Sequence, residues 1–410
     1  MIPFTKRKSR KEQLAYAQHL LDSGDQALHQ GNLTEGLLFY QEAFLIKTGI
    51  LGPGHPEINE AAERISQSIS QAENPDEAFR FFSQSIAQFE NQTDPRYLHL
   101  GYLFERVGNF FNSMDNLVEA RQWFTLAVTV FERALGPESR ELLFVLQKLV
   151  GLEYNLGDLT TAKALLERVL AIDEHLYGAD SIKIASDLVT MGEILANLGD
   201  LEAARASYAR VVAIDEQRLP AAHTKLAADL TRLAATRSSL GDFTGAIADL
   251  QRVLAIDEQL FGPFHPKVAI DMNSLYEVHE RLGDKDNMLV CLERVLAIDE
   301  RAFGADTPRV AADHSRLGAL RMAMNNPESA RSNFTQAIAI NEGAFGRDHP
   351  KLAPDINSLG SVQEALDDLV GARDSYARAL RIYEQFLPAG HPQICEVRSS
   401  LDRVTPKLPS

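Results

Sequence analysis

Histidine is the residue type in this chain with the widest chemical potential, because it binds metals and transfers protons near neutral pH. The 410 residues include 11 histidines. Five of them recur at one position of a repeating pattern: His55, His223, His265, His349 and His391. Residues that recur once per repeat lie far apart along a repetitive fold, so they do not converge on one metal ion. We therefore expect a structural role for these histidines and no metal site.

Motifs of common catalytic sites are absent from the sequence. It contains no HExxH zinc motif, no GxSxG nucleophile motif and no phosphate-binding loop. Gly52 and Gly54 lack the third glycine and the preceding strand of a dinucleotide-binding loop. Cys291 has no local base that would activate it, so we expect a structural thiol there. These observations predict a non-catalytic protein with no cofactor and no small-molecule substrate.

Acidic residues outnumber basic ones, with 57 Asp and Glu against 41 Lys and Arg and a formal net charge of -16. This excess argues against binding to nucleic acid or to an anionic membrane, since both need a basic surface. Two cysteines, Cys291 and Cys395, cannot form a disulfide framework or a CxxC zinc site. There is no apolar run of transmembrane length and no apolar core of a secretory signal near the first residue. We expect a cytoplasmic protein.

A period of 42 residues organises the sequence. Four Gly-Asp pairs follow one another at this spacing: Gly157-Asp158, Gly199-Asp200, Gly241-Asp242 and Gly283-Asp284. The period extends to nine units without an insertion or a deletion. Small residues recur five positions after each of these anchors and large residues four positions later, as expected where two helices touch. Each unit therefore predicts two antiparallel helices.

The sequence also contains residues that are typical of the ends of these helices. The anchor glycine can end the first helix in the left-handed conformation, and the aspartate after it can cap the second helix, as at Asp158, Asp200 and Asp242. Three prolines suit the first turn of the following helix: Pro266, Pro350 and Pro392.

The order of residues within a unit resembles the tetratricopeptide repeat (TPR). In one unit it reads Met191-Gly192, Leu195, Ala204, Tyr208 and Pro220. The period is longer than the usual TPR, and with the sequence RVLAIDEQLFGPFHPKV it resembles the kinesin light chain type. The resemblance implies an all-α fold, a right-handed α-solenoid of nine TPR-like helix pairs plus a C-terminal capping helix. HEAT-like helical repeats are the alternative fold. They lack the columns, that is, the fixed positions of the repeat at which small or aromatic residues recur.

The chain is predicted to contain four segments. They are a basic flexible tail (1–10), nine 42-residue repeats (11–392), a polar capping helix (393–404) and a short tail (405–410). The first two repeats are degenerate, with Ser23 in place of a leucine and Glu73-Asn74-Pro75 at the turn. A capping helix is expected because the last face of a solenoid meets solvent.

Acidic residues form three columns in the repeats. One column contains Glu90, Glu132, Glu174, Glu216, Glu258, Glu300, Glu342 and Glu384. The second contains Asp173, Asp215, Asp257 and Asp299, and the third Asp187, Asp229, Asp271, Asp313 and Asp355. The helix dipole disfavours carboxylates near a helix C-terminus, so the glutamates need partners. We expect hydrogen bonds or ion pairs between repeats, and ligand binding is the alternative.

In TPR arrays, which this chain resembles, the face of each first helix opposite its core stripe lines a concave groove that binds peptides. Five positions of one column on this face are basic: Arg64, Arg106, Lys148, Arg232 and Arg316. Asn273 and Asn357 match the asparagines with which grooves of this type hold a peptide backbone, since an amide both donates and accepts hydrogen bonds. Tyr102, Phe144 and Tyr154 lie on the same face, outside the core columns.

Exposed aromatic residues beside basic ones are typical of protein-binding hot spots, and cation–π contacts within one helix are the alternative. The sequence thus predicts a scaffold that binds an extended peptide or a partner protein, acidic and with an aromatic or apolar anchor. Two other functions remain open. One is a regulatory or adaptor subunit of an enzyme supplied in trans, such as a protease-like partner, and the other is RNA binding, which the net charge disfavours.

Overall fold

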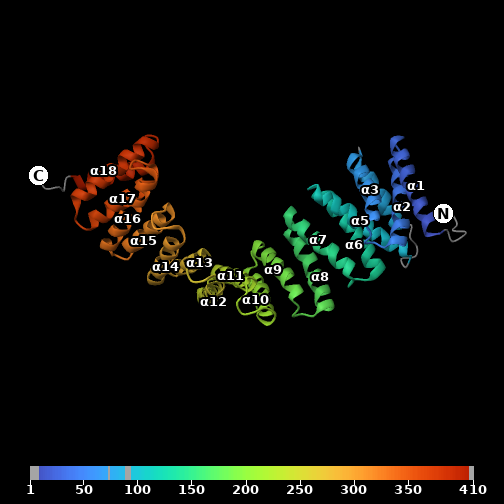
Figure 1. The fold of residues 1–410 in the computed structure, drawn as a ribbon, viewed down its shortest axis with the longest axis horizontal. Coiled ribbons are helices and arrows are strands. Elements are labelled where there is room, and N and C mark those ends of the chain that lie inside the picture. Colours follow the sequence, from blue (N-terminus) through green and yellow to red (C-terminus); the bar gives the residue numbers. More distant parts are fainter. Residues whose placement is uncertain (1–8, 73, 88–93, 406–410) are drawn as a thin grey trace. The chain divides into compact units, whose positions relative to one another are not determined.

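The computed structural model describes residues 9–72, 74–87 and 94–405, and the regular secondary structure of these residues is helical (Figure 1). The chain divides into two compact units, Met1–Ile214 and Asp215–Ser410. Residues 1–8 of the predicted basic tail and 406–410 of the predicted C-terminal tail lie outside the described residues, as do Glu73 and Glu90.

Helices of the first unit follow one another in antiparallel pairs. They are α1 (Arg10–His29), α2 (Leu33–Leu51), a 3-10 turn η1 (Pro56–Ile58), α3 (Asn59–Gln71), α4 (Pro75–Ala87), α5 (Pro95–Ser113), α6 (Leu117–Leu135), α7 (Arg140–Leu156), α8 (Leu159–Tyr177), α9 (Ile182–Asn197) and α10 (Leu201–Arg218). The last turn of α10 contains Asp215, the first residue of the second unit.

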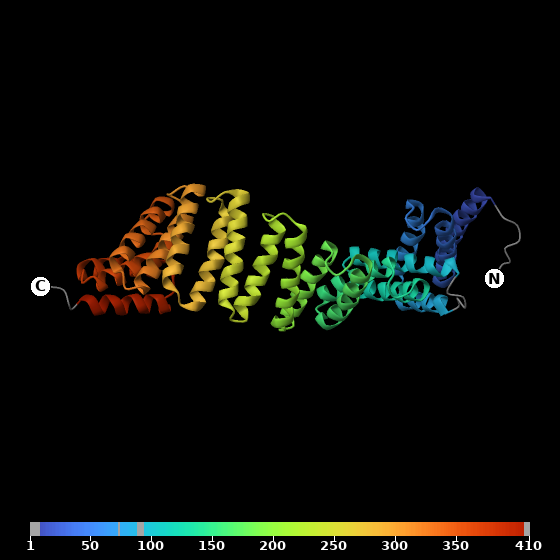
Figure 2. The ribbon, with the colours of Figure 1, turned by 90° about the horizontal axis from the view of Figure 1, so that it is seen from below.

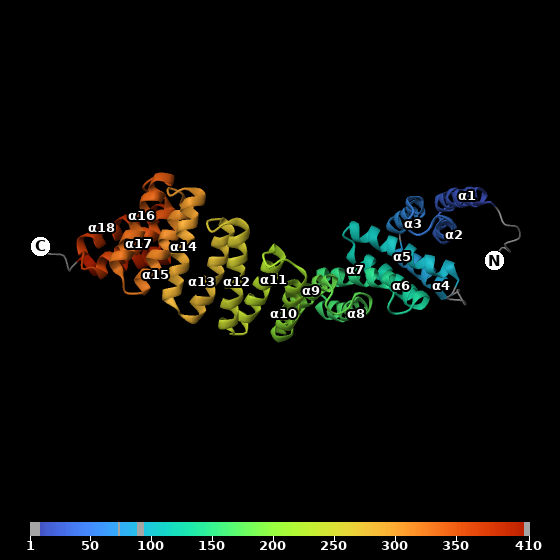
Figure 3. The ribbon, with the colours of Figure 1, turned by 60° about the horizontal axis from the view of Figure 1, so that its bottom comes forward.

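Helices of the second unit continue the same alternation. They are α11 (Thr224–Ser239), α12 (Phe243–Phe261), α13 (Pro266–Leu282), α14 (Lys285–Phe303), α15 (Pro308–Ala323), α16 (Pro327–Phe345), η2 (Pro350–Leu352), α17 (Ala353–Ala365), α18 (Leu369–Phe386) and α19 (Pro392–Val404). Figures 2 and 3 show the partners of a pair, such as α13 and α14, side by side. Nine pairs followed by α19 in the described residues confirm the predicted all-α repeat fold.

Within a pair, the chain reverses at a residue in the left-handed conformation. Gly157 has a φ of 82°, and the Asp158 side chain after it accepts a hydrogen bond from the Thr161 N–H at 3.0 Å. Asp115 and Asn325 take the position of this glycine in other repeats, with φ values of 59° and 56°. Asp and Asn tolerate this conformation better than other side chains do. The predicted turn and cap are therefore confirmed, and the turn persists where the glycine is lost.

The recurring histidines cap the next helix. In each of the five, Nδ1 accepts a hydrogen bond from the backbone N–H two residues later, at 3.1 Å for His223 and 3.2 Å for His265. An oxygen or nitrogen acceptor at this position satisfies a backbone donor that the helix leaves unpaired. The expected structural role of the histidine column is confirmed.

The small and aromatic columns meet where the two helices of a pair cross. A Cβ atom added to Gly192 would lie 2.6 Å from Cε1 of Tyr208, and one added to Gly360 would lie 2.7 Å from Cε1 of Tyr376. Each aromatic ring thus occupies the space that a side chain at the glycine would need. In repeats 2 and 3 the core is largely aromatic, with the Phe82 ring centroid 5.4 Å from that of Trp123.

Glutamates of the second helices form ion pairs with the following repeat. Arg210 lies 2.6 Å from Glu174, and Arg378 lies 2.6 Å from Glu342. Equivalent pairs join Arg168 to Glu132, Arg252 to Glu216 and Arg294 to Glu258. The expected inter-repeat role of this column is confirmed at these positions.

We predict that Gly192→Ala lowers the free energy of unfolding by about 1–3 kcal/mol, because its Cβ would overlap Tyr208. Gly151 in α7 is the matched control, since it is exposed and a Cβ there meets no atom within 4 Å. Gly151→Ala should raise stability by about 0.5–1 kcal/mol through the helix propensity of alanine. Urea unfolding of the three proteins measures both changes, and equal effects of the two substitutions would contradict the close crossing.

Candidate functional site

The predicted binding residues lie on the first helices of the repeats, a surface here called the first-helix face. Six of them belong to the first unit: Arg64, Tyr102, Arg106, Phe144, Lys148 and Tyr154. Four belong to the second: Arg232, Asn273, Arg316 and Asn357. Each set is described within its own unit.

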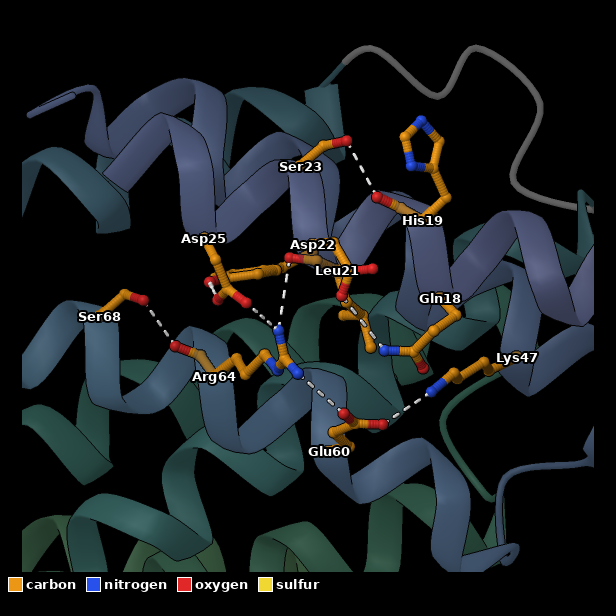
Figure 4. Close-up of polar contacts among 11 residues, drawn as sticks. Gln18, His19, Leu21, Asp22, Ser23, Asp25, Lys47, Glu60, Arg64 and Ser68 are labelled. Atoms are coloured by element: carbon orange, nitrogen blue, oxygen red, sulfur yellow. Dashed lines mark hydrogen bonds and ion pairs between the residues drawn. The ribbon is translucent and has the colours of Figure 1, made fainter. Parts of the chain in front are cut away.

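Arg64 on α3 is held by acidic residues of two helices (Figure 4). Its guanidinium lies 2.5 Å from Asp25 on α1 and 3.0 Å from Glu60 on its own helix. Asp25 also accepts the Tyr40 hydroxyl at 2.6 Å, and Glu60 pairs with the buried Lys47 at 3.0 Å. Burial alone would raise the pKa of Glu60, but Lys47 and Arg64 lower it below its ordinary value. The Arg64 network thus ties the first two repeats together.

Arg106 and Lys148 have partners in the preceding repeat as well. Arg106 donates to the Pro53 carbonyl at 2.6 Å and to the Asn59 side chain. Burial lowers the pKa of the Arg106 guanidinium. The Lys148 ammonium lies 2.5 Å from Glu105 on α5. These contacts were not predicted, because they depend on how far one repeat is displaced from the next.

The three aromatic residues of the first unit differ in exposure. Phe144 is 56% exposed. Tyr102 is half-buried, with its ring edge-on to Phe131 at 5.2 Å, and burial followed by the charge of Glu141 raises its pKa to about 12. The Tyr154 hydroxyl accepts a hydrogen bond from Asn197 of the next repeat at 3.2 Å.

No cation–π contact joins Tyr102 to Arg106 or Phe144 to Lys148 in the described part of the chain. The Lys148 ammonium instead lies 5.8 Å from the Phe124 ring centroid. The alternative of cation–π pairs within one helix therefore does not account for Phe144.

In the second unit, polar residues of the first-helix face also contact one another. Arg232 donates to Asp229 at 2.9 Å. Arg316 donates to the Asn273 side-chain oxygen at 2.9 Å, while the Asn273 amide nitrogen donates to the Ala269 carbonyl at 2.9 Å. The half-buried side chain of Asn357 has no hydrogen-bond partner among the described residues.

Ile270 is a residue of this face that the sequence analysis missed. It lies on α13, three periods after Phe144, and is 61% exposed. Ile270 is neither aromatic nor charged, and its spacing of three periods from Phe144 is the signal that identifies the position. Exposed apolar side chains thus occur at equivalent positions in the two units.

Among the residues that the structure describes, no group of three or more His, Cys, Asp or Glu side chains is arranged to hold a metal ion. Burial and the charge of Asp284 raise the pKa of the Cys291 thiol to about 11. Within the described ranges, every helix is too short or too polar to cross a membrane.

The sequence profile of the tetratricopeptide repeat family matches three stretches, residues 143–217, 226–301 and 310–385, which together make up more than half of the chain. The chain belongs to the tetratricopeptide repeat family. Proteins built from TPRs bind other proteins, and this TPR chain is accordingly a protein-interaction scaffold in general character. No curated protein matches it in sequence.

Several solved structures of repeat proteins are similar to this TPR chain. The nearly identical TPR-like repeats of a kinesin light chain-type protein from Podosopora anserina share 22% identity, over 49% of this chain and 95% of theirs, with a TM-score of 0.41. BtubC (BKLC) from P. vanneervenii shares 21% identity over 57% of this chain and 95% of its own, with a TM-score of 0.40. The C-terminal part of a TPR repeat-containing protein from Cytophaga hutchinsonii shares 14% identity over 72% of this chain and 98% of its own, with a TM-score of 0.49.

We predict that Arg64→Ala lowers the free energy of unfolding of the TPR chain by about 1–3 kcal/mol, because Asp25 and Glu60 lose a charged hydrogen-bond donor. Arg80→Ala on α4 is the control, since Arg80 is exposed and forms no ion pair among the described residues. Thermal unfolding followed by circular dichroism makes the comparison. If both variants unfold at the wild-type temperature, the Arg64 network does not hold the first repeats together.

Proposed function

We propose that this chain is a non-catalytic scaffold that binds an extended peptide segment of a partner protein along its first-helix face. The segment would bring an aromatic or apolar anchor to Phe144 and carry acidic residues beside it. An equivalent contact at Ile270 would serve the second unit.

The observation that carries this proposal is the exposure of Phe144. Its ring is 56% exposed, whereas Leu142 and Leu146, two positions before and after it on α7, are buried. Lys148 lies one helical turn later on α7, so an anchor on Phe144 would be followed by a basic group. Aromatic residues flanked by charge are frequent centres of binding energy in protein interfaces.

The acidic preference of the ligand rests on the more accessible cations. The Lys148 side chain is 35% exposed although Glu105 pairs with it, so a ligand carboxylate could share the ammonium, which has three donors. Arg64 and Arg106 already bond internal partners and would contribute mainly by long-range attraction. The apolar anchor therefore carries more of the proposed affinity than the charges.

Backbone contacts with the ligand fall to Asn357 rather than to Asn273. The Asn273 amide already bonds the Ala269 carbonyl and Arg316. The Asn357 amide is half-buried and retains its donors and its acceptor. We propose that it bonds the main chain of a segment that binds the second unit.

Titration with fluorescent acidic peptides that contain a central Phe or Trp tests the proposal. Phe144→Ala should weaken binding about tenfold or more, because a central aromatic contact is lost. Val118→Ala is the matched control, since Val118 is 48% exposed but lies on the second helix α6. The control should bind as the wild type does.

Two results would contradict the proposal. Equal affinities of Phe144→Ala and wild type would show that the anchor does not bind at Phe144. A catalytic partner that copurifies in a fixed ratio, with contacts that Phe144→Ala leaves intact, would favour the adaptor subunit instead.

A further inference from the structure

Pairs of aspartates lie buried at three successive repeat junctions of residues 215–410. Each pair joins the end of a second helix to the start of the next first helix. The pairs, here called the acid pairs, are Asp215 with Asp229, Asp257 with Asp271, and Asp299 with Asp313. All six side chains are 5% exposed or less. Buried carboxylates are costly unless they are paired with positive charge or protonated.

Each acid pair has one basic residue between its two carboxyl groups or beside one of them. The Lys225 ammonium lies 2.7 Å from Asp215 and 3.3 Å from Asp229, so these two carboxyl groups meet at a single cation. Lys267 lies 2.8 Å from Asp257, and Arg309 pairs with Asp299. One cation therefore faces two acids at the Asp257–Asp271 junction, whereas Arg232 also pairs with Asp229 at the first junction and Arg316 lies near Asp313 at the third.

Several carboxyl oxygens of the acid pairs have no donor. One oxygen each of Asp271, Asp299 and Asp313 is buried without a hydrogen-bond partner in the described part of the chain. A buried carboxylate oxygen without a donor favours the neutral acid, which can then donate to the other carboxylate of its pair.

Other charged groups around the acid pairs come from both helices of each junction. Asp229 faces Asp215, Lys225 and Arg232. Asp271 faces Asp257, Glu258 and Lys267, and Asp313 faces Asp299, Arg309 and Arg316. Asp271 has the most acidic surroundings of the three, with two carboxylates and one cation.

We propose that the acid pairs Asp257–Asp271 and Asp299–Asp313 form a pH-sensitive clasp, in which each pair shares one proton up to neutral pH and loses it, with a weaker junction, as the pH rises. With the proton on the Asp257–Asp271 pair, the remaining carboxylate is balanced by Lys267, and Glu258 beside it is balanced by Arg294. Without it, the junction contains a second buried carboxylate that has no counter-charge.

The direction of the pH effect follows from the two pKa values involved. In an unfolded chain an aspartate loses its proton near pH 3.9. Burial, followed by the neighbouring Asp257, raises the pKa of Asp271 to about 7, and burial with Asp299 does the same for Asp313. Between these values the folded state binds more protons than the unfolded state. The contribution of these aspartates to stability is therefore greatest in acid, falls as the pH rises towards about 7, and stays low above it.

The next junction has an amide in place of the first acid of the pair. Asn341 stands at the position equivalent to Asp299 and is 8% exposed, and Asp355 follows it 14 residues later. An amide donates a hydrogen bond at any pH, so an Asn–Asp combination needs no shared proton.

The double variant Asp257→Asn/Asp299→Asn transfers this combination to two acid pairs. Urea unfolding of the full chain is compared at about pH 5.5 and about pH 8 with wild type and with Asp306→Asn, which removes a charge from an exposed loop position. For wild type, the folded-to-unfolded ratio should fall on the order of tenfold per acid pair between the two pH values. The folded-to-unfolded ratio of the double variant should fall much less, and at the higher pH it should exceed the ratio of wild type. An identical pH dependence of the double variant and wild type would overturn the proposal.

Carbon-13 NMR titration of the aspartate carboxyl groups tests the same proposal in the unmodified chain. We expect at least two aspartates of residues 215–410 to titrate near neutral pH. If all of them titrate below about pH 5, as ordinary aspartates do, the acid pairs share no proton and the proposal is wrong.

Discussion

A single pair of antiparallel helices buries too little apolar surface to fold alone, so every repeat of this chain depends on its neighbours. The same few kinds of contact recur every 42 residues and join the helices of the chain. A small residue such as Gly192 lets an aromatic ring fill the crossing within a pair. Ion pairs such as Arg210 with Glu174 join second helices of successive repeats, and contacts such as Lys148 with Glu105 join first helices.

This dependence explains why so many charged residues of the chain are not free to bind a ligand. The acidic excess suggests at first a protein that repels anions, but several of the acidic residues lie between helices. Arg64 and Arg106 likewise hold preceding repeats. What remains for a partner is a small number of exposed groups on the first-helix face. Phe144 and Ile270 are the most exposed apolar residues among them.

The fold could be predicted from the sequence because its signals are local and repeated. Gly157-Asp158 identifies a turn on its own, and the period carries that turn to Asp115 and Asn325, where the glycine is missing. The partners of Arg106 could not be predicted in this way. The Pro53 carbonyl is 53 residues away, and only the three-dimensional offset of two repeats brings it within 2.6 Å. Tyr102 lies outside the core columns, but its ring packs edge-on against Phe131. Its position in the repeat therefore did not predict that it is half-buried.

We propose that a partner segment binds the first helices and not the second helices. Hydrogen–deuterium exchange of the full chain, with and without a saturating acidic peptide that contains an aromatic residue, tests it directly. We expect slower exchange in α5 and α7, around Phe144, and no change in the neighbouring second helices α6 and α8. Protection confined to α6 and α8 would contradict the account.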